Sequence, residues 1–303
     1  MKPLHTRLQE ARRDLGLPWE VLERDYLLSW ILAGIGQVPA LRDSLVFKGG
    51  TALKKCYFGE YRFSEDLDFT GLPGVPTGEA LLAAVGEACA AAAGLLDEYA
   101  PVGIDCTRYT EREPHPGGQE AFTIRARLPW QTGPTTRVMV EVTVDEPLLR
   151  PAIRRPILHE YGEPIQADVQ VYALEEIVAE KLRAILQHAR KLEERGWSRS
   201  RARDYYDLWR LFEAFGDRMD LAEFADLLSA KCAVRSVAFS QPDDFFPDVV
   251  LDHVERTWAQ WLGPLVSPLP RFETVIAELR PRIGALIRGR KKQGVKQGER
   301  QET

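Results

Sequence analysis

The sequence predicts an α+β protein in which a sheet flanked by helices is followed by a C-terminal helical domain. Short β-type runs between residues 44 and 145 are bounded by glycine, proline and other turn residues. From Leu174 onward, apolar residues recur almost throughout at helical spacing. We therefore expect a first domain over residues 1–165, a helical domain over 166–285 and a disordered basic tail over 286–303.

Composition bounds the class of protein. The 303 residues are 45% hydrophobic and 28% charged, with a net charge of −5, so a nucleic-acid contact would come from local basic patches. The cysteines and histidines are scattered, which argues against a zinc site and a disulfide framework. The most apolar run, 26–38, is shorter than the roughly 20 residues that span a bilayer. Without an apolar leader at its N-terminus, we expect a cytoplasmic protein with no membrane partner.

The elements of the first domain follow from periodicity. Helical spacing covers 4–14 and 18–35, and "SLVF" (44–47) has the pattern of a short buried strand. Gly49-Gly50 then forms a turn, and "TALKKCYF" predicts a helix for which Thr51 is a suitable cap. This is a strand, loop and helix unit.

The next strand alternates in polarity. "SEDLDFT" (64–70) places Asp66, Asp68 and Thr70 on one face and its apolar residues on the other. After a break at 71–77, an Ala/Leu-rich helix is expected to pack on the sheet. Two further strands are predicted, "AFTIRARLPW" and "TTRVMVEVTVDE". In the second, Glu141 and Asp145 share the polar face, so either could supply a third carboxylate.

The carboxylates and the glycine turn favour one kind of chemistry. Carboxylates on one strand face suit Mg²⁺, which keeps coordination positions for water and substrate phosphates. Backbone N–H groups of Gly49-Gly50 at a helix N-terminus suit a triphosphate. Each feature alone is weak, because acidic pairs and Gly-Gly turns are common. Their combination within about 20 residues, framed by Lys48, Arg62 and Ser64, indicates a metal-bridged nucleotide site.

Four ordered motifs carry a resemblance to a known family. "FKGGTAL…RFSEDLDF" resembles the first motif of the AbiEii/AbiGii-type nucleotidyltransferase toxins, relatives of the DNA polymerase β superfamily and toxins of type IV toxin–antitoxin systems. "LERDYLLSWIL" is similar to the leading helix of that family, "EEIVAEKLRAIL" to its lysine motif and "RARDYYDLW" to its Arg-Asp-x-x-Asp-Leu motif. Together these motifs span residues 20–210.

The resemblance implies a polymerase β-like nucleotidyltransferase fold with a mixed sheet over residues 1–165, using an NTP with Mg²⁺ or Mn²⁺. Asp66 and Asp68 would hold the metal, and we assign Glu141 as the third ligand. Lys181 and Asp207 complete the expected catalytic set, with Asp207 positioning Lys181 or closing the cleft, and Asp204 pairing with an arginine. The expected nucleotide contacts are Lys48, Gly49, Gly50, Thr51, Arg62, Ser64 and Lys181.

The function implied is transfer of NMP from an NTP to RNA, in particular to the 3′ acceptor end of tRNA, which blocks growth until a cognate antitoxin intervenes. The stretch from Arg190 to Arg203, which includes Trp197, has the basic and aromatic character of an RNA contact, although a solvated helix end has the same composition. The alternatives are nucleotidylation of a protein hydroxyl and a non-catalytic GTP-binding regulator. A D-x-D glycosyltransferase ranks third, because it leaves the Gly-Gly-Thr helix start unexplained.

Overall fold

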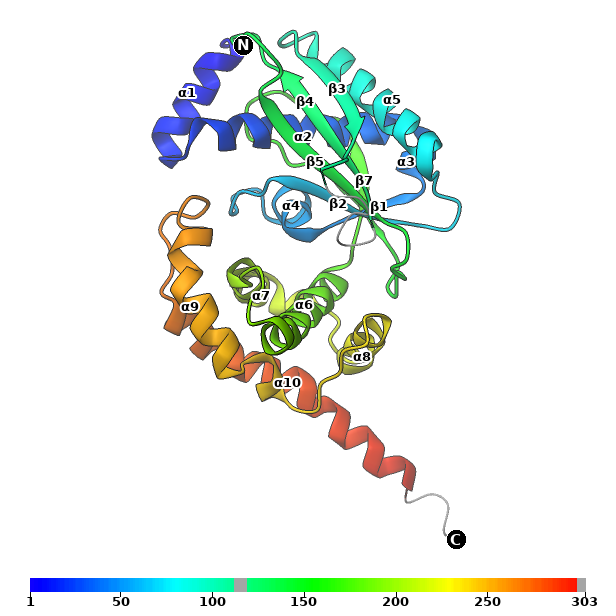
Figure 1. Cartoon of the computed structure of the whole chain (residues 1–303), viewed down its shortest axis with the longest axis vertical. Coiled ribbons are helices and arrows are strands. Elements are labelled where there is room, and N and C mark those ends of the chain that lie inside the picture. The colour runs from blue at the N-terminus through cyan, green and yellow to red at the C-terminus, as the bar shows by residue number, and fades with distance from the viewer. Residues whose placement is uncertain (112–118, 299–303) are drawn as a thin grey trace. The chain divides into compact units, whose positions relative to one another are not determined.

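The computed structural model describes residues 1–111 and 119–298, which form two compact units (Figure 1). The N-terminal unit comprises Met1–Tyr172 and Leu265–Ser267; the C-terminal unit comprises Ala173–Pro264 and the segment that begins at Pro268. The boundary lies after Tyr172 rather than after residue 165, because a last strand pairs with the sheet through Phe47 and Val171.

The N-terminal unit contains a mixed sheet, as predicted. Among the described residues its strands are β1 (Leu45–Lys48), β2 (Asp66–Gly71), β3 (Gly103–Arg108), β4 (Glu120–Arg127), β5 (Thr136–Thr143), β6 (Ile153–Pro156) and β7 (Asp168–Val171). They lie in the order β3-β4-β5-β2-β1-β7-β6. The β2–β5 and β1–β7 pairs are parallel, and the other pairs are antiparallel. β2, the aspartate strand, therefore lies between β1 and β5 inside the sheet.

Three of these strands were not predicted. β3 is an edge strand without a fully buried residue, and only Ile104 and Cys106 make its half-buried face apolar, which is a weak signal. β6 and β7 have four residues each, and their sequences, IRRP and DVQV, carry little strand signal. Only pairing with the rest of the sheet makes these short segments strands.

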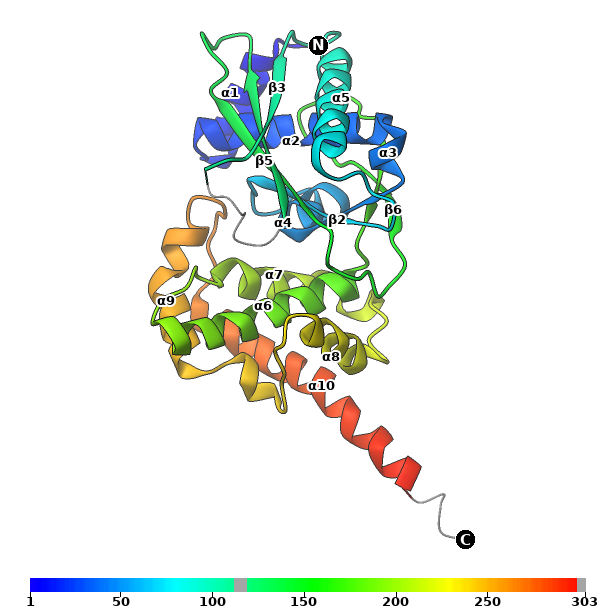
Figure 2. The same ribbon diagram turned by 45° about the vertical axis from the view of Figure 1, so that its right-hand side comes forward.

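Helices flank the sheet: α1 (Leu4–Leu15), α2 (Trp19–Gln37), α3 (Pro39–Arg42) and α5 (Gly78–Leu96). α5 packs across α2 (Figure 2). The crossing is close at Gly34, where an added Cβ would collide with the Ala88 carbonyl and lie 3.0 Å from the Ala92 Cβ. α5 is long and apolar enough by composition to cross a membrane, but core helices of soluble proteins share this property. Its small residues here serve close packing.

Gly49 and Gly50 do not precede the helix, as expected, but form its first turn, which is called the glycine turn below. The helix begins at Gly49 as α4 (Gly49–Ala52) and continues as a π-helical segment, η1 (Leu53–Phe58). Thr51 is therefore inside the helix and does not cap it. Its hydroxyl instead donates to the Asp66 carbonyl at 2.5 Å, because β2 runs directly beside this turn.

The C-terminal unit is helical, with α6 (Leu174–Arg195), α7 (Ala202–Phe215), η2 (Gly216–Arg218), α8 (Phe224–Val234), η3 (Pro242–Phe245), α9 (Asp248–Leu262) and α10 (Phe272–Gly298). Its interior includes an ion pair between Lys231 and Glu176 at 2.7 Å, with both side chains fully buried. α10 continues to Gly298, whereas we expected a disordered tail from residue 286; residues 299–303 lie outside the described part of the chain.

Candidate active site

The predicted carboxylates gather on adjacent strands of the N-terminal unit. β2 and β5 pair in parallel, with Asp68 opposite Glu141 and Asp66 opposite Met139. Leu67 between the two aspartates is fully buried, whereas Asp66, Asp68 and Glu141 are half-buried. Because paired residues of neighbouring strands project to the same side, these three carboxylates share one face of the sheet.

Asp145, the other candidate for the third carboxylate, lies beyond the strand. β5 ends at Thr143, and both Val144 and Asp145 are exposed. The alternation that put Asp145 on the Glu141 face therefore stops before reaching it. The structure thus aligns Glu141, and not Asp145, with Asp68.

The glycine turn lies directly against the aspartates. Lys48, the last residue of β1, is the strand partner of Asp68. Gly49 follows with φ of +81°, a conformation that side chains other than glycine rarely adopt. A Cβ at Gly49 would come within 2.7 Å of the Asp68 Oδ2. Glycine is therefore required for both the backbone angle and the space beside the carboxylate.

Cationic side chains border the same turn. Arg62 is 4% exposed, and its Cζ lies 3.1 Å from the point where a Cβ on Gly50 would be. Its Nη1 donates to the Phe63 carbonyl at 3.1 Å, which holds the guanidinium over Gly50. Lys48 is 8% exposed, with its ammonium 5.7 Å from the centre of the Tyr172 ring. Ser64 is half-buried and precedes Asp66 by two residues. The turn thus lies between carboxylates and cations.

The donor set fits a hard divalent cation in its chemistry and strand register, since all three ligands are carboxylates on one sheet face. Within residues 1–111 and 119–298, however, no group of three His, Cys, Asp or Glu side chains is placed so that it could hold a metal ion. The strand register places Asp68 opposite Glu141, with Asp66 two residues away on the same face.

The lysine motif forms a second charged cluster, within the C-terminal unit. Lys181 of α6 donates to Asp207 Oδ2 at 2.6 Å and to Asp204 Oδ1 at 3.2 Å, both on α7. Lys181 is 7% exposed and Asp207 is fully buried. Arg201 contacts the other oxygen of Asp204 at 3.3 Å. Asp207 therefore orients Lys181, while Asp204 bridges Lys181 to Arg201. Both contacts were expected from the sequence.

The basic stretch from Arg190 to Arg203 connects α6 and α7. Trp197 is 72% exposed there, and Arg199 and Arg203 lie 5.3 Å and 5.5 Å from the centre of the Trp261 ring. Partial burial, and then the nearby charges of Arg201, Arg195 and Arg190, lower the pKa of Lys191. Arginines of this stretch thus pack on the half-buried Trp261, and the same stretch exposes Trp197.

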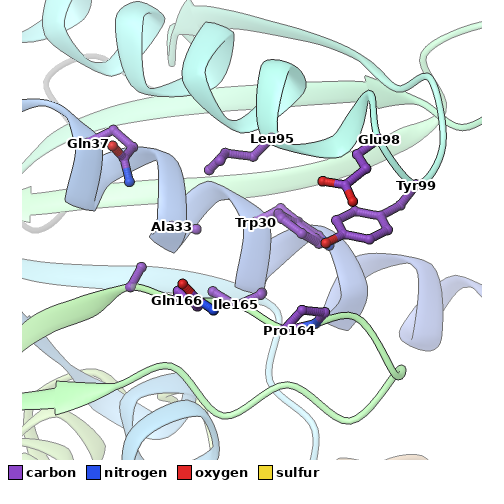
Figure 3. Close-up of a pocket in the computed structure, with 10 residues that line it drawn as sticks. Trp30, Ala33, Gln37, Leu95, Glu98, Tyr99, Pro164, Ile165 and Gln166 are labelled. Carbon is purple, nitrogen blue, oxygen red and sulfur yellow. The ribbon is translucent and has the colours of Figure 1, made fainter.

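A pocket of about 290 Å³ lies elsewhere in the N-terminal unit, between α2, the end of α5 and residues 164–167 (Figure 3). The Trp30 and Tyr99 rings, 5.6 Å apart, form part of its wall, with Glu98 beside them. None of the residues that line it belongs to the predicted nucleotide or metal set, so this pocket is separate from the glycine turn.

Sequence reasoning missed a buried ion pair behind the turn. Asp25 of α2 pairs with Lys55 of η1 at 2.8 Å, and both side chains are almost completely buried. Asp25 lies within the motif "LERDYLLSWIL", where a charged residue beside a long apolar run was the available signal. The partner of Asp25 could be identified only from the fold.

Comparisons with known proteins agree with this architecture. The family model of the nucleotidyl transferase AbiEii toxin, type IV toxin–antitoxin system, matches residues 30–278. Among solved structures, MenT4, a nucleotidyltransferase toxin from Mycobacterium tuberculosis, superposes with a TM-score of 0.57 at 22% identity, covering 89% of this chain and 84% of that one. No curated protein sequence matches. With a sheet that aligns carboxylates beside a glycine turn and a family match over most of its length, the chain belongs to the AbiEii nucleotidyltransferase toxins of type IV toxin–antitoxin systems.

Proposed function

We propose that this nucleotidyltransferase transfers a nucleoside monophosphate from an NTP to RNA, at the 3′ acceptor end of tRNA, and thereby blocks translation. The observation that carries the proposal is the alignment of Asp68 with Glu141 directly beside the Gly49 turn. This alignment brings groups suited to a cation next to backbone suited to phosphate.

Asp66, Asp68 and Glu141 would hold the divalent cation, Mg²⁺ or Mn²⁺. When bound, the cation supplies positive charge that offsets the charge developing on the reacting phosphates. The donor set supports this role through its hard oxygen chemistry, and the strand register supports it through its placement. Asp66 has an added constraint, because its backbone carbonyl accepts the Thr51 hydroxyl and so ties β2 to the turn.

The turn would bind the triphosphate. Backbone N–H groups of Gly49 and Gly50 would donate to phosphate oxygens, with Lys48, Arg62 and Ser64 as side-chain contacts. Thr51 supports this loop from within, through its bond to Asp66. Lys181 would contribute a further cationic contact, oriented by Asp207.

The reaction requires no covalent enzyme intermediate. The acceptor hydroxyl oxygen forms a bond to the α-phosphorus, the bond from that phosphorus to the bridging oxygen of the β-phosphate breaks, and pyrophosphate leaves. The hydroxyl proton is released to solvent. The protein contributes by aligning the hydroxyl with the departing pyrophosphate and by excluding other geometries.

RNA is favoured as acceptor by the basic stretch of the C-terminal unit. Cationic side chains bind a phosphate backbone, and an exposed ring such as Trp197 offers a surface on which an unpaired base can stack. The family implies a cognate antitoxin partner. Because NTPs and tRNA are cytoplasmic, we infer that the protein acts in the cytoplasm.

The test incubates the protein with each α-labelled NTP, a divalent cation and purified tRNA. We expect label in tRNA with release of one pyrophosphate per nucleotide, and neither product from Asp68→Asn. Label found in protein would identify a protein hydroxyl as the acceptor. Nucleotide binding without pyrophosphate release, over a range of RNA and protein acceptors, would identify a regulator and contradict the proposed function.

A further inference from the structure

A charged pair is buried behind the helix that starts at the glycine turn. Lys55 Nζ lies 2.8 Å from Asp25 Oδ2, and the two side chains are 2% and 1% exposed. The Tyr161 hydroxyl donates to the same oxygen at 3.0 Å. Among the described residues, Asp25 Oδ1 is buried without a hydrogen-bond partner. The pair is thus enclosed by protein and incompletely hydrogen-bonded.

Stability alone is a weak explanation for such a pair. Removing two charges from water is costly, and well-packed apolar residues often replace a buried ion pair without loss of stability. Burial raises the pKa of Asp25, but the charges of Lys55 and Lys54, together with the hydrogen bonds from Lys55 and Tyr161, outweigh burial and hold the pKa below its ordinary value. The carboxylate therefore remains ionised. A buried, ionised and directional contact is suited to setting geometry.

The contact is made in an unusual part of the helix. Lys55 belongs to the π-helical segment η1, and such segments are rare and frequent at functional sites. The carbonyls of Lys55 and Cys56 are bound from outside the helix, by the Leu158 N–H at 2.7 Å and the Arg155 Nε at 2.6 Å. The backbone of this turn is therefore held by the neighbouring segment.

Lys54, the residue before Lys55, holds the C-terminal end of η1. Lys54 Nζ donates to Glu160 at 2.9 Å and to the Gly59 carbonyl at 3.0 Å, where the helix ends. Of these anchors, Asp25 is the one that belongs to α2. Its loss would release η1 from that anchor on α2 while leaving the hydrogen bonds to residues 155–160.

The same helix begins at the proposed phosphate-binding turn. Gly49 lies beside Asp68, and a small rotation of the helix would move both glycine N–H groups relative to that carboxylate. We propose that Asp25 is a positioning residue, which through its ion pair with Lys55 sets the rotation of residues 49–58 and so aims the Gly49 and Gly50 amides at the nucleotide. This inference rests on the proposed nucleotide-binding role of the turn.

The test compares two variants with the wild type. Asp25→Asn keeps the side-chain shape but removes the charge, whereas Asp25→Leu combined with Lys55→Met replaces the whole pair with apolar side chains. For each we would measure the melting temperature, kcat and KM for NTP, and amide hydrogen exchange of residues 49–58 well below the melting temperature. Exchange in β5 serves as the internal control for general loosening.

In Asp25→Asn we expect KM for NTP to rise about tenfold to a hundredfold, as loss of a binding geometry implies, with faster exchange in 49–58 and unchanged exchange in β5. The double variant should recover the melting temperature while KM stays raised. A KM that recovers together with stability, or a normal KM in folded Asp25→Asn, would overturn the proposal. If Asp25→Asn does not fold, the KM of the double variant tests the proposal: a raised KM supports it and a normal KM contradicts it.

Failure of the acceptor assignment is separable from failure of this inference. The Kd of a non-hydrolysable NTP analogue needs no acceptor, so it replaces KM if the wild type binds nucleotide without labelling RNA. That result would contradict the proposed acceptor alone. Equal Kd values for wild type and both variants would then refute the role of Asp25.

Discussion

The two charged clusters of this toxin differ in how they are assembled. On the sheet, strand register sets three carboxylates side by side, Asp66, Asp68 and Glu141. Between α6 and α7, Lys181 lies between two carboxylates, within 3.2 Å of each. The first cluster sets three carboxylates next to one another, with Lys48 and Arg62 at the adjoining turn, whereas the second encloses one ammonium between two carboxylates. We infer that the sheet cluster is built for an incoming cation, and the helical cluster for holding one side chain in place.

We expect substitutions in the sheet cluster to reduce activity without reducing stability, and substitutions in the helical cluster to reduce stability. The largest expected effect is the loss of activity in the sheet cluster. Asp68→Asn should lower nucleotide transfer about a hundredfold or more, through loss of several kcal/mol of metal-based stabilisation. Its melting temperature should be unchanged or raised, because a like charge is removed. Glu141→Gln should behave similarly and Asp145→Asn should be mild. Labelled-NTP incorporation with thermal melting checks this, and the reverse order for Glu141 and Asp145 would correct the ligand assignment.

In the helical cluster, unlike the sheet cluster, we expect substitution to lower the stability of the fold. Asp207→Asn removes the nearer carboxylate of the buried Lys181 ammonium, and breaking a buried pair in this way costs about 3 kcal/mol. Urea unfolding followed by a probe in the C-terminal unit measures the change. The control on the same helix is Glu213→Gln, whose exposed pair with Arg210 should contribute about 0.5 kcal/mol. Equal effects of the two variants would contradict the distinction.

Acid should weaken the C-terminal unit through a buried histidine. Burial, and then the charge of Arg201, lower the pKa of His188 from 6.5 to about 4. Between these values the unfolded chain binds the proton and the folded chain does not, so stability falls as pH drops from 6.5 toward 4, by up to about 3 kcal/mol. Urea midpoints across this range should show the loss, and His188→Gln should flatten it.

The N-terminal unit also contains a buried histidine, His159, whose pKa burial lowers from its ordinary 6.5. A carboxylate that contacts this histidine titrates at lower pH. Burial raises the pKa of Glu163, but bonds from His159, Arg7 and Tyr26 outweigh it and lower the pKa to about 2. Stability from this carboxylate is present above pH 4.5 and is lost as pH falls toward 2. Stability of the N-terminal unit that stays constant between pH 4.5 and pH 2 would contradict the role of Glu163.

The glycine turn should be sensitive to a single methyl group. Gly49→Ala forces alanine to a φ of +81° and places its Cβ against Asp68, so we expect a loss of about 1–3 kcal/mol together with weaker nucleotide binding. Gly86→Ala is the matched control, because it lies inside α5 with open space around it and should gain about 0.5–1 kcal/mol. Melting curves and nucleotide titrations of both variants give the answer.

The smallest effect concerns the basic stretch. Reversing Arg190 and Lys191 to Glu should weaken RNA binding and reduce the slope of log K against log salt by about one for each RNA phosphate that these side chains neutralise. The same reversal at the exposed Arg12 and Arg13 of α1 should leave the slope unchanged. Nucleotide binding should be unaffected in both variants. A slope identical to wild type would remove Arg190 and Lys191 from the RNA surface.

Local patterns in the sequence determined much of the fold and of the proposed site. Polar alternation put Asp66 and Asp68 on one strand face, and buried Leu67 confirms it. Gly49-Gly50 between a strand and a helix indicated the turn, and helical spacing located the helices of the C-terminal unit. These features depend on residues close together in the chain, so periodicity and turn chemistry were enough to predict them.

Contacts between distant residues were decided only by the tertiary structure. Pairing of β2 with β5 aligned Glu141 with Asp68, and the end of β5 left Asp145 outside the strand. Similarly, only the packing of η1 against α2 joined Lys55 to Asp25, two charges that local rules would assign to the surface. Strand order and the burial of charge depend on which segments pack together. The free energy of that packing is distributed over many residues far apart in the sequence, so no local pattern reveals it.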